Sequence, residues 1–162
     1  MTEAAQANPQ PNTQPVFNIE KLYVKDLSLE VPNAPQIFLE RDNPQIDLQL
    51  HSQAAPIEEG LFDVTVTVTV TVKLPEKDKV LFLIEAKQAG IFQVRNIPAE
   101  ELETVLAVVC PNILYPYLRE VVSDVAIRAG FAPVMLNPIN FEAIYLQQKQ
   151  QKQAQASEVV KH

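Results

Sequence analysis

Tryptophan is absent from this chain of 162 residues, which has only one cysteine, two histidines and three glycines. These shortages exclude several classes of site. Cys110 alone cannot form an internal disulfide, and a zinc site needs three or four cysteine, histidine or carboxylate ligands at suitable spacing. With so few glycines, no glycine-rich loop is available to cradle a phosphate. We therefore expect no metal site, no cofactor and no nucleotide chemistry.

The remaining candidates for catalysis are weak. His51 and Ser52 are adjacent, but neighbouring residues of a strand point to opposite faces, and no acidic residue is clearly placed to orient the imidazole. Cys110 lies in an apolar stretch with no adjacent cation to favour its thiolate. We expect His51 to be a surface residue and Cys110 a buried structural thiol, in a protein that is not an enzyme.

The pattern of a signal peptide is also missing, because no apolar stretch follows a basic region near Met1. The most apolar segment, residues 105–118, contains prolines and is too short to span a bilayer. The net charge is -7, and residues 1–60 hold nine acidic against three basic side chains. Nucleic acid requires clustered lysine and arginine, so a basic protein is the more plausible partner. We expect a soluble, cytoplasmic protein.

The most regular pattern is the alternation of valine and threonine over residues 64–72. Because successive side chains of a strand point to opposite faces, this segment has a valine face and a threonine face. Asp63 and Lys73 end the threonine face with charges. An uncharged, β-branched strand of this length would template aggregation at an open edge. We therefore expect it inside a sheet, with its threonine face toward water.

Three other segments have strand patterns. Residues 17–30 alternate in their second half, and a bulge is expected around residues 21–24, where the phase is lost. Residues 46–50 also alternate. Residues 80–94 begin with apolar side chains on both faces, which favours a central strand or a contact with another subunit.

Proline-rich and polar segments mark the connections and the ends. Residues 31–35 contain two prolines and are expected to cross in extended form to the second strand, and residues 55–60 are expected to form a loop. Residues 1–15 are predicted to be disordered and residues 149–162 to be a flexible tail, which leaves residues 16–148 as one folded domain.

After Pro98 the apolar period becomes helical. A first helix is expected to end at Pro111, a second to cover residues 113–129 with one apolar stripe, and a third to begin with Asn140 as its N-cap. Four strands followed by helices predict an α+β fold with the helices packed on one face of the sheet.

Two pairs of residues suggest a recognition surface. Asp26 and Glu30 are four residues apart, which places them on one strand face about 13 Å from each other, too far for paired acid–base chemistry. Leu83 and Glu85 point outward if Phe82 points inward. A leucine flanked by carboxylates fits a basic partner with an apolar centre. Spacing alone favours the simpler interpretation, which is a solvated face with one exposed leucine.

Several short motifs are specific when taken together in their order and spacing. They are Lys25-Asp26 with Glu30, the Pro-Asn-Ala-Pro of residues 32–35, residues 90–92, the Cys-Pro-Asn-Ile-Leu block that opens residues 110–120, and residues 138–141. Over residues 17–148 the chain resembles SecB, the family of bacterial protein-export chaperones. The resemblance implies a four-stranded antiparallel sheet and a homotetramer built as a dimer of dimers. It also implies a protein that holds unfolded preproteins in apolar grooves and delivers them to the SecA ATPase, without catalysis.

The resemblance also implies roles for individual residues. It assigns SecA binding to the four residues that strand parity groups on the outer face: Asp26, Glu30, Leu83 and Glu85. The implied client-groove positions are Phe38, Ile46, Leu48, Leu50, Phe82, Phe141, Ile144 and Tyr145. We expect Phe38, Leu48 and Phe141 to be partly exposed, whereas Phe82 and Ile46 could also be partial core. Some members carry a tryptophan where this chain reads Asp42-Asn43, so a weaker aromatic end of the groove is expected.

Two other classes of function remain open. An α+β enzyme that binds a small ligand would need a deep pocket with a convergent polar group, which the sequence does not supply. A SecB-like adaptor or scaffold of another system, such as a toxin–antitoxin pair, would keep the acidic patch but lack the grooves. Slower refolding of an unfolded preprotein at near-stoichiometric tetramer would distinguish a chaperone from both, although the sequence does not identify its clients.

Overall fold

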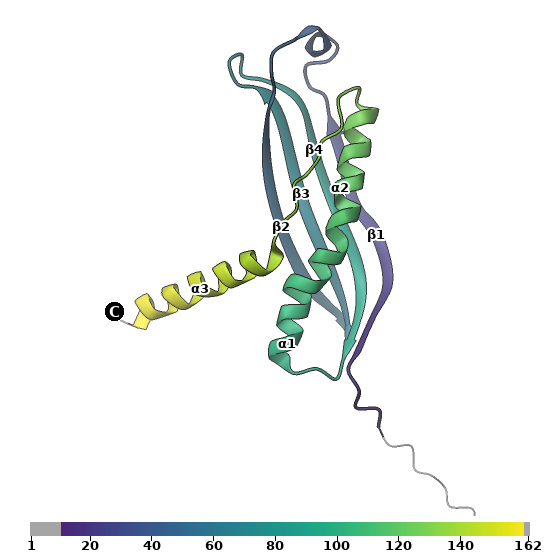
Figure 1. Cartoon of the computed structure of the whole chain (residues 1–162), viewed down its shortest axis with the longest axis vertical. Helices are drawn as coiled ribbons and strands as arrows, with labels where there is room; N and C mark the ends of the chain where they lie inside the picture. Colours follow the sequence, from purple (N-terminus) through teal and green to yellow (C-terminus); the bar gives the residue numbers. More distant parts are fainter. Residues whose placement is uncertain (1–10, 161–162) are drawn as a thin grey trace, which may run out of the picture.

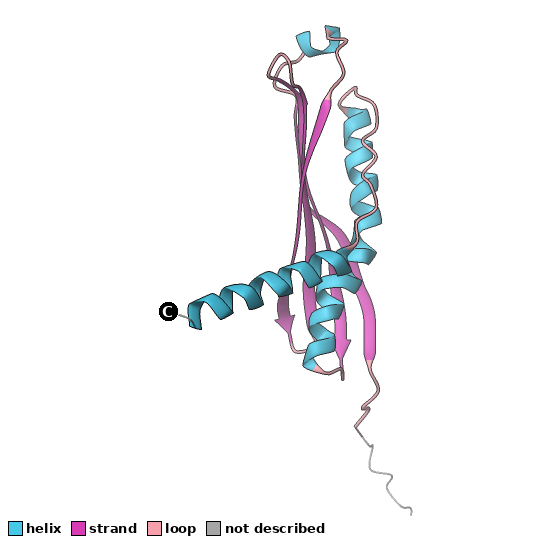
Figure 2. Cartoon of the chain, turned by 60° about the vertical axis from the view of Figure 1, so that its left-hand side comes forward, coloured by secondary structure: helices cyan, strands magenta, loops and turns pink. Residues whose placement is uncertain are grey.

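A four-stranded antiparallel sheet in the order β1-β4-β3-β2 dominates the computed structural model, which describes residues 11–160 (Figure 1). The strands are β1 (Val16–Glu30), β2 (Gln45–Glu58), β3 (Leu61–Leu74) and β4 (Lys79–Arg95). The helix that follows the strands lies on one face of the sheet (Figure 2). The predicted α+β class, the central position of β4 and the internal position of β3 are therefore confirmed.

The two faces of β3 differ in burial, but less sharply than the alternation predicts. The valine face forms the centre of the core, and Val64, Val66 and Val70 have no exposed surface. On the other face, Thr65 and Thr67 are also buried, so the expectation of a wholly wet threonine face is wrong there. At Thr65, the Lys25 side chain of β1 reaches across the sheet and donates a hydrogen bond to the threonine hydroxyl at 2.9 Å.

The predicted helix break at Pro111 does not occur. The helix α1 (Ala99–Thr104), a π-helical segment (Val105–Val109) and the helix α2 (Cys110–Arg128) follow one another without interruption. The N–H of Cys110 donates to the carbonyl of Val105, five residues earlier. A proline normally ends a helix because its ring clashes with the carbonyl four residues earlier, and the wider π turn relieves this crowding.

The helix α2 packs across β3 and β4 and buries one stripe of its surface. The predicted stripe is confirmed, since Leu114, Leu118 and Val122 are fully buried. At Gly90 the helix approaches the sheet closely, because an added Cβ would lie 2.7 Å from the Phe92 ring and 3.1 Å from Leu114. The contact between helix and sheet therefore depends on a residue without a side chain.

Because the break is absent, Ala99–Arg128 forms a helical stretch of 30 residues. By length and composition alone, this stretch could cross a membrane, contrary to the prediction that residues 105–118 are too short. A core helix of a soluble protein meets the same criterion. Here the apolar stripe of α2 is buried against the sheet, as in such a core helix.

Two connections differ from their predictions. Residues 31–35 form turns rather than an extended crossing, and a short 3-10 helix follows at Gln36–Leu39. The loop expected over residues 55–60 is reduced to a tight turn, because β2 pairs with β3 as far as Glu58. Gly60 closes this turn at a φ of 75°, a conformation that favours glycine.

The last helix, α3 (Phe141–Val160), begins as predicted, since the Asn140 side chain accepts a hydrogen bond from the N–H of Ala143 at 3.0 Å. It does not end near residue 148 but continues to Val160, extending away from the sheet (Figures 1 and 2). The segment expected to be a tail is thus helical over most of its length, and its flexibility stays a prediction. Of the predicted disordered segment, residues 1–10 lie outside the described residues.

Candidate functional site

The outer face of the sheet, turned away from α2, brings together the four residues assigned to SecA docking. On β1 and β4, Glu30 lies opposite Leu83, and Ser28 lies opposite Glu85. Asp26 lies one pair further along, opposite Lys87. Asp26 and Glu30 are exposed, whereas Leu83 and Glu85 are half-buried. We call the surface formed by Asp26, Glu30, Leu83 and Glu85 the docking face.

The centre of the docking face is a shallow depression of about 140 Å³. It is lined by Ser28, Glu30, Thr69, Leu83, Ile84 and Glu85. A half-buried leucine between two carboxylates offers an apolar contact surrounded by negative charge. The depression can therefore receive a small apolar side chain whose neighbours are basic.

Two bulges in β1 decide which of its side chains point to the outer face. The pairing with β4 shifts between Ile19 and Lys21 and again between Val24 and Asp26, so the bulges flank the expected region instead of lying in it. Each extra residue reverses the alternation of side chains. After the second bulge, Leu27 and Leu29 share the helix side, and the carboxylates share the outer side.

A polar cluster lies beside the docking face. The Lys25 ammonium donates hydrogen bonds to the Asp63 carboxylate and, at 2.9 Å, to Thr65 Oγ1, and the Tyr23 hydroxyl donates to Asp63 Oδ1 at 2.8 Å. The hydrogen bond to Asp63 raises the pKa of Lys25. Burial, and then Asp63, raise the pKa of Tyr23. Sequence reasoning identified Asp63 only as a strand-end charge, because its partners are about 40 residues away.

On the opposite face, β2 carries an apolar strip that α2 does not cover. Ile46 and Leu48 are 50% and 46% exposed, and Leu50 is half-buried. They share the valine face of β3, but α2 packs over β3 and β4 instead of over β2. At 3.4 Å per residue, the side of β2 from Ile46 to Ala54 is about 27 Å long. This length suits an extended segment of about eight residues.

One end of the strip opens into a cavity of about 380 Å³ between β2, the helical residues 103–107 and α3. Ile144 and Tyr145 line it, together with Phe141, and their role in client binding stays a prediction. The expected partial exposure of Phe141 is wrong, since it is 3% exposed and its ring lies edge-on to Tyr115 at 5.7 Å. The first turn of α3 is held in the core by this aromatic contact, so Phe141 can supply only an edge of the cavity.

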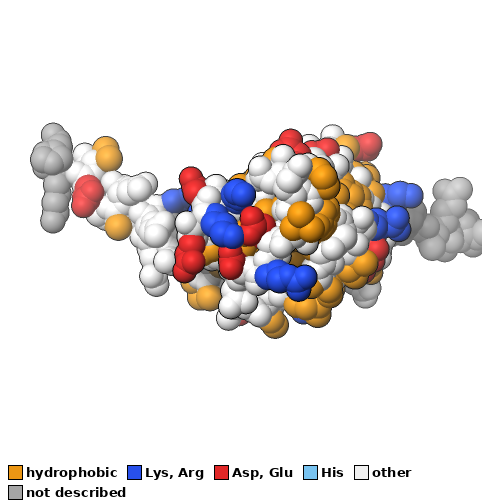
Figure 3. Space-filling model, turned by 90° about the horizontal axis from the view of Figure 1, so that it is seen from above, with side chains coloured by type: hydrophobic (Ala, Val, Ile, Leu, Met, Phe, Trp, Pro, Cys, Tyr) orange, Lys and Arg blue, Asp and Glu red, His pale blue; other side chains and the backbone are white. Residues whose placement is uncertain are grey.

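The other end of the strip is aromatic. Phe38 is 49% exposed and stacks on Phe131 at 5.1 Å, and Phe131 in turn contacts Phe82 at 4.6 Å. Phe82 itself is buried, as the core alternative allowed. Sequence reasoning missed Phe131, because it lies in an irregular segment without an apolar period. From this end, hydrophobic side chains are visible next to acidic and basic ones (Figure 3). We call the surface from Phe38 along β2 to Ile144 and Tyr145 the apolar groove.

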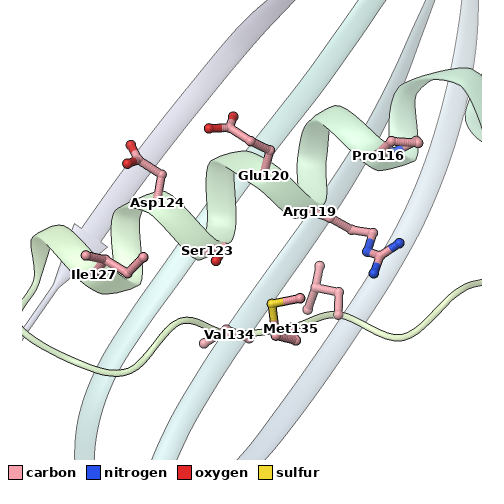
Figure 4. A pocket seen from close by; sticks show the side chains of 9 residues that line it. Pro116, Arg119, Glu120, Ser123, Asp124, Ile127, Val134 and Met135 are labelled. Carbon is pink, nitrogen blue, oxygen red and sulfur yellow. The ribbon is translucent and has the colours of Figure 1, made fainter.

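A second cavity of about 380 Å³ lies between α2 and the segment that returns along it, residues 134–136 (Figure 4). Arg119 extends toward this segment, and Glu120 and Asp124 of α2 also line the cavity (Figure 4). Within residues 11–160, no buried side-chain nitrogen or oxygen lacks a hydrogen-bond partner, and no group of three potential metal ligands occurs. No buried, unpartnered polar atom in the described residues therefore marks this cavity as a ligand site.

The candidate catalytic groups are placed as expected. His51 and Ser52 are exposed and lie on opposite faces of β2, so they do not form a nucleophile and base pair. Cys110 is fully buried, and its burial raises the pKa of the thiol to about 12. A buried thiol that stays protonated at neutral pH is a poor nucleophile, because the thiolate is the reactive form.

The chain is similar to known proteins over most of its length. The family described as "Preprotein translocase subunit SecB" matches residues 10–152. The protein-export protein SecB of Nitrosomonas eutropha is 64% identical over 145 residues, which cover 90% of both chains. The one from Chromobacterium violaceum is 63% identical over 143 residues, covering 88% of this chain and 94% of its own.

A solved structure supports the fold. It contains a SecB-like chaperone from Mycobacterium tuberculosis in complex with a peptide from an antitoxin. It superposes with a TM-score of 0.63 at 20% identity and covers 76% of this chain and 90% of that one. The sequence matches over nearly the whole folded region, together with the shared fold, mean that this chain belongs to the SecB family of protein-export chaperones.

Proposed function

We propose that this protein captures unfolded preproteins in the apolar groove and passes them to SecA through the docking face, without ATP and in the cytoplasm. The observation that carries the proposal is the separation of the two surfaces by one sheet. The exposed leucine and isoleucine of β2 lie on the helix side, whereas the carboxylates of β1 and β4 lie on the outer side. A client can therefore stay bound while SecA docks.

Client binding in the groove relies on many weak contacts. Half-exposed residues such as Phe38 and Leu48 offer apolar surface without a deep pocket, so each contact is reversible. A long unfolded chain can occupy several such sites on one assembly and gains affinity by multivalency. Folding buries the segments that the groove needs, so fast-folding proteins escape capture. No sequence motif in the client is required.

Docking of SecA relies on charge and on one apolar contact. Glu30 and Glu85 flank Leu83, and Asp26 lies further along the same face, opposite Lys87. This arrangement fits a partner surface with basic side chains beside an apolar one. Because exposed charges are screened within about 10 Å at 0.1 M ionic strength, salt should weaken this interaction.

A crossed pair of substitutions tests the proposal. Leu48→Asp puts a charge in the groove and should abolish the delay in preprotein refolding, while SecA binding remains. Glu85→Lys reverses a charge on the docking face and should weaken SecA binding, while the delay remains. Both positions are partly exposed, so both variants should keep their fold and assembly. Refolding kinetics, a SecA titration at low salt and thermal unfolding should use the same samples.

The pattern of losses decides between the candidate functions. If neither variant changes refolding and the parent does not delay it, the groove is not a client site and an adaptor function is favoured. If Glu85→Lys binds SecA as tightly as the parent, the docking face is assigned wrongly. A fold that collapses in Leu48→Asp would place Leu48 in the core of the assembly, and Phe38→Asp then provides the second groove variant.

A further inference from the structure

We propose that Lys25 is a positioning residue of the docking face: its ion pair with Asp63 fixes the bulge of β1 at residue 25 and so turns Asp26 outward. This inference rests on the proposed function of that face. The strand register shows where the bulge lies. Val24 lies opposite Gln88 and Asp26 opposite Lys87, so Lys25 is an extra residue without a partner on β4.

The presence of this extra residue decides which side chains form the docking face. Tyr23 points outward, because its hydroxyl reaches Asp63 on that side of the sheet. With strict alternation, Asp26 would then point to the helix side and Leu27 toward the outer face. The extra residue reverses the alternation, so Asp26 joins Glu30 on the outer face and Leu27 joins the helix side. Without an extra residue between Tyr23 and Asp26 this assignment would be lost, and a bulge at residue 26 would leave Asp26 itself without a partner on β4.

The contacts of Lys25 hold the bulge in place. Its side chain crosses β4 at Ala89, which lies between Tyr23 on β1 and Thr65 on β3. Ala89 is fully buried, and its small side chain leaves room for the lysine stem above it. The ammonium ends at the Asp63 carboxylate and the Thr65 hydroxyl. If residue 24 bulged instead, Lys25 would face the helix side and its ammonium would lose both acceptors, so the ion pair favours the bulge at residue 25.

The charge of Lys25 makes it possible to distinguish a positioning role from a purely electrostatic one, because the two predict opposite changes in binding affinity. Lys25→Gln removes a positive charge beside Asp26 and makes the docking face more negative. If only charge mattered, a basic partner would bind this variant more tightly. If Lys25 positions Asp26, the variant should bind more weakly, because the carboxylate loses its fixed direction. Side chains with 35% and 19% exposure form an ion pair that adds little to stability, so the fold should persist.

A SecA titration of the full-length assembly shows whether Lys25→Gln strengthens or weakens binding. The samples are the parent, Lys25→Gln, Lys25→Arg and Glu85→Lys, each checked for its assembly size by light scattering. We expect Lys25→Gln to bind about fivefold more weakly, the order of one lost exposed charge contact. Lys25→Arg keeps a cation of similar reach and should bind within about twofold of the parent. Amide hydrogen exchange over residues 22–30 is the second readout, and Lys25→Gln should exchange faster there, with β3 unchanged.

Each result bears on the proposal separately from the docking function. Binding by Lys25→Gln that equals or exceeds that of the parent overturns the positioning role. Weaker binding with unchanged exchange also overturns it, because Lys25 would then contact SecA directly. If the parent does not bind SecA, or Glu85→Lys binds like the parent, the docking function fails. The exchange data then decide alone: faster exchange over residues 22–30 supports the role of Lys25, and unchanged exchange overturns it.

Discussion

Three phenylalanines assigned to the same groove have different environments. Phe38 is half-exposed, whereas Phe82 and Phe141 are almost fully buried. Phe82 is covered by Phe131, and Phe141 by Tyr115, both of which come from distant parts of the chain. A phenylalanine can therefore serve as groove or as core according to the residue that happens to cover it. Packing also decides the environment of Cys110, the first residue of α2, whose side chain is fully buried in the core.

The burial of Cys110 predicts a pH-dependent stability. Its pKa is raised from 9.0 to about 12 in the folded protein, so the folded state favours the protonated thiol. Below pH 9 the stabilisation of the folded state by the protonated thiol is fully present. It decreases as the pH rises from 9 toward 12, because the thiol of the unfolded chain ionises first. The free energy of unfolding of the parent should fall more steeply in this window than that of Cys110→Ala, as measured by urea titrations.

The same site offers a chemical measurement. At pH 8, a thiol reagent should modify folded Cys110 more than about a hundredfold more slowly than the unfolded chain, because both access and thiolate are lacking. No other cysteine contributes to the signal. Rapid modification of the native protein would show that this end of α2 opens frequently.

At the scale of the elements, the contact between α2 and the sheet depends on two local features. The π-helical segment lets one helix continue through Pro111, and the missing side chain at Gly90 lets that helix approach β4. The helix is thereby centred on β3 and β4, and the helix-side surface of β2 stays free. The groove exists because the helix is not wide enough to cover all four strands.

Gly90→Ala should therefore destabilise the fold. The added methyl group would lie 2.7 Å from the Phe92 ring, which is fully buried, and 3.1 Å from Leu114, so core side chains must shift to admit it. We expect a loss of about 1 to 3 kcal/mol in the free energy of unfolding, as for other overpacked cores. Ser52→Thr is the matched control, since it adds one carbon at an exposed position on the same face and should change stability by less than about 0.5 kcal/mol. Equal stability of both variants would contradict the close approach.

At the scale of the whole molecule, one sheet separates two kinds of surface, but the single chain exposes more apolar area than the groove requires. Tyr117 and Ile127 of α2 are 48% and 54% exposed, and Met135 beside them is 72% exposed. Ile19 and Leu27, on the helix side of β1, are 46% and 42% exposed. Extended apolar surfaces of this kind mark sites of interaction, among them contacts with other protein chains.

We therefore propose a homotetramer built as a dimer of dimers, in line with the family. Light scattering at micromolar concentration should give about four times the 18.1 kDa of one chain. Ile127→Asp should lower the measured mass, because a charge would be buried in a contact between subunits. Glu85→Lys, on the opposite face, should leave the mass unchanged. A parent that is monomeric under these conditions would disprove the tetramer.

The sequence by itself determined the features that depend on residues close together in the chain. The valine and threonine alternation defines a two-faced strand, the apolar stripe of residues 113–129 defines a helix, and Asn140 caps the next one, because periodicity and capping are local. Even the grouping of Asp26 with Glu30 follows from a spacing of four residues.

Only the tertiary structure decided the features that depend on distant neighbours. Pro111 predicts a helix end locally, yet packing of the continuous helix on the sheet outweighs this preference. The burial of Phe141, the stacking of Phe38 on Phe131 and the position of the bulge at Lys25 each depend on a partner in another element. The physical reason is that a short pattern sets the direction of a side chain relative to its own strand or helix. What covers that side chain is set by the packing of the whole chain.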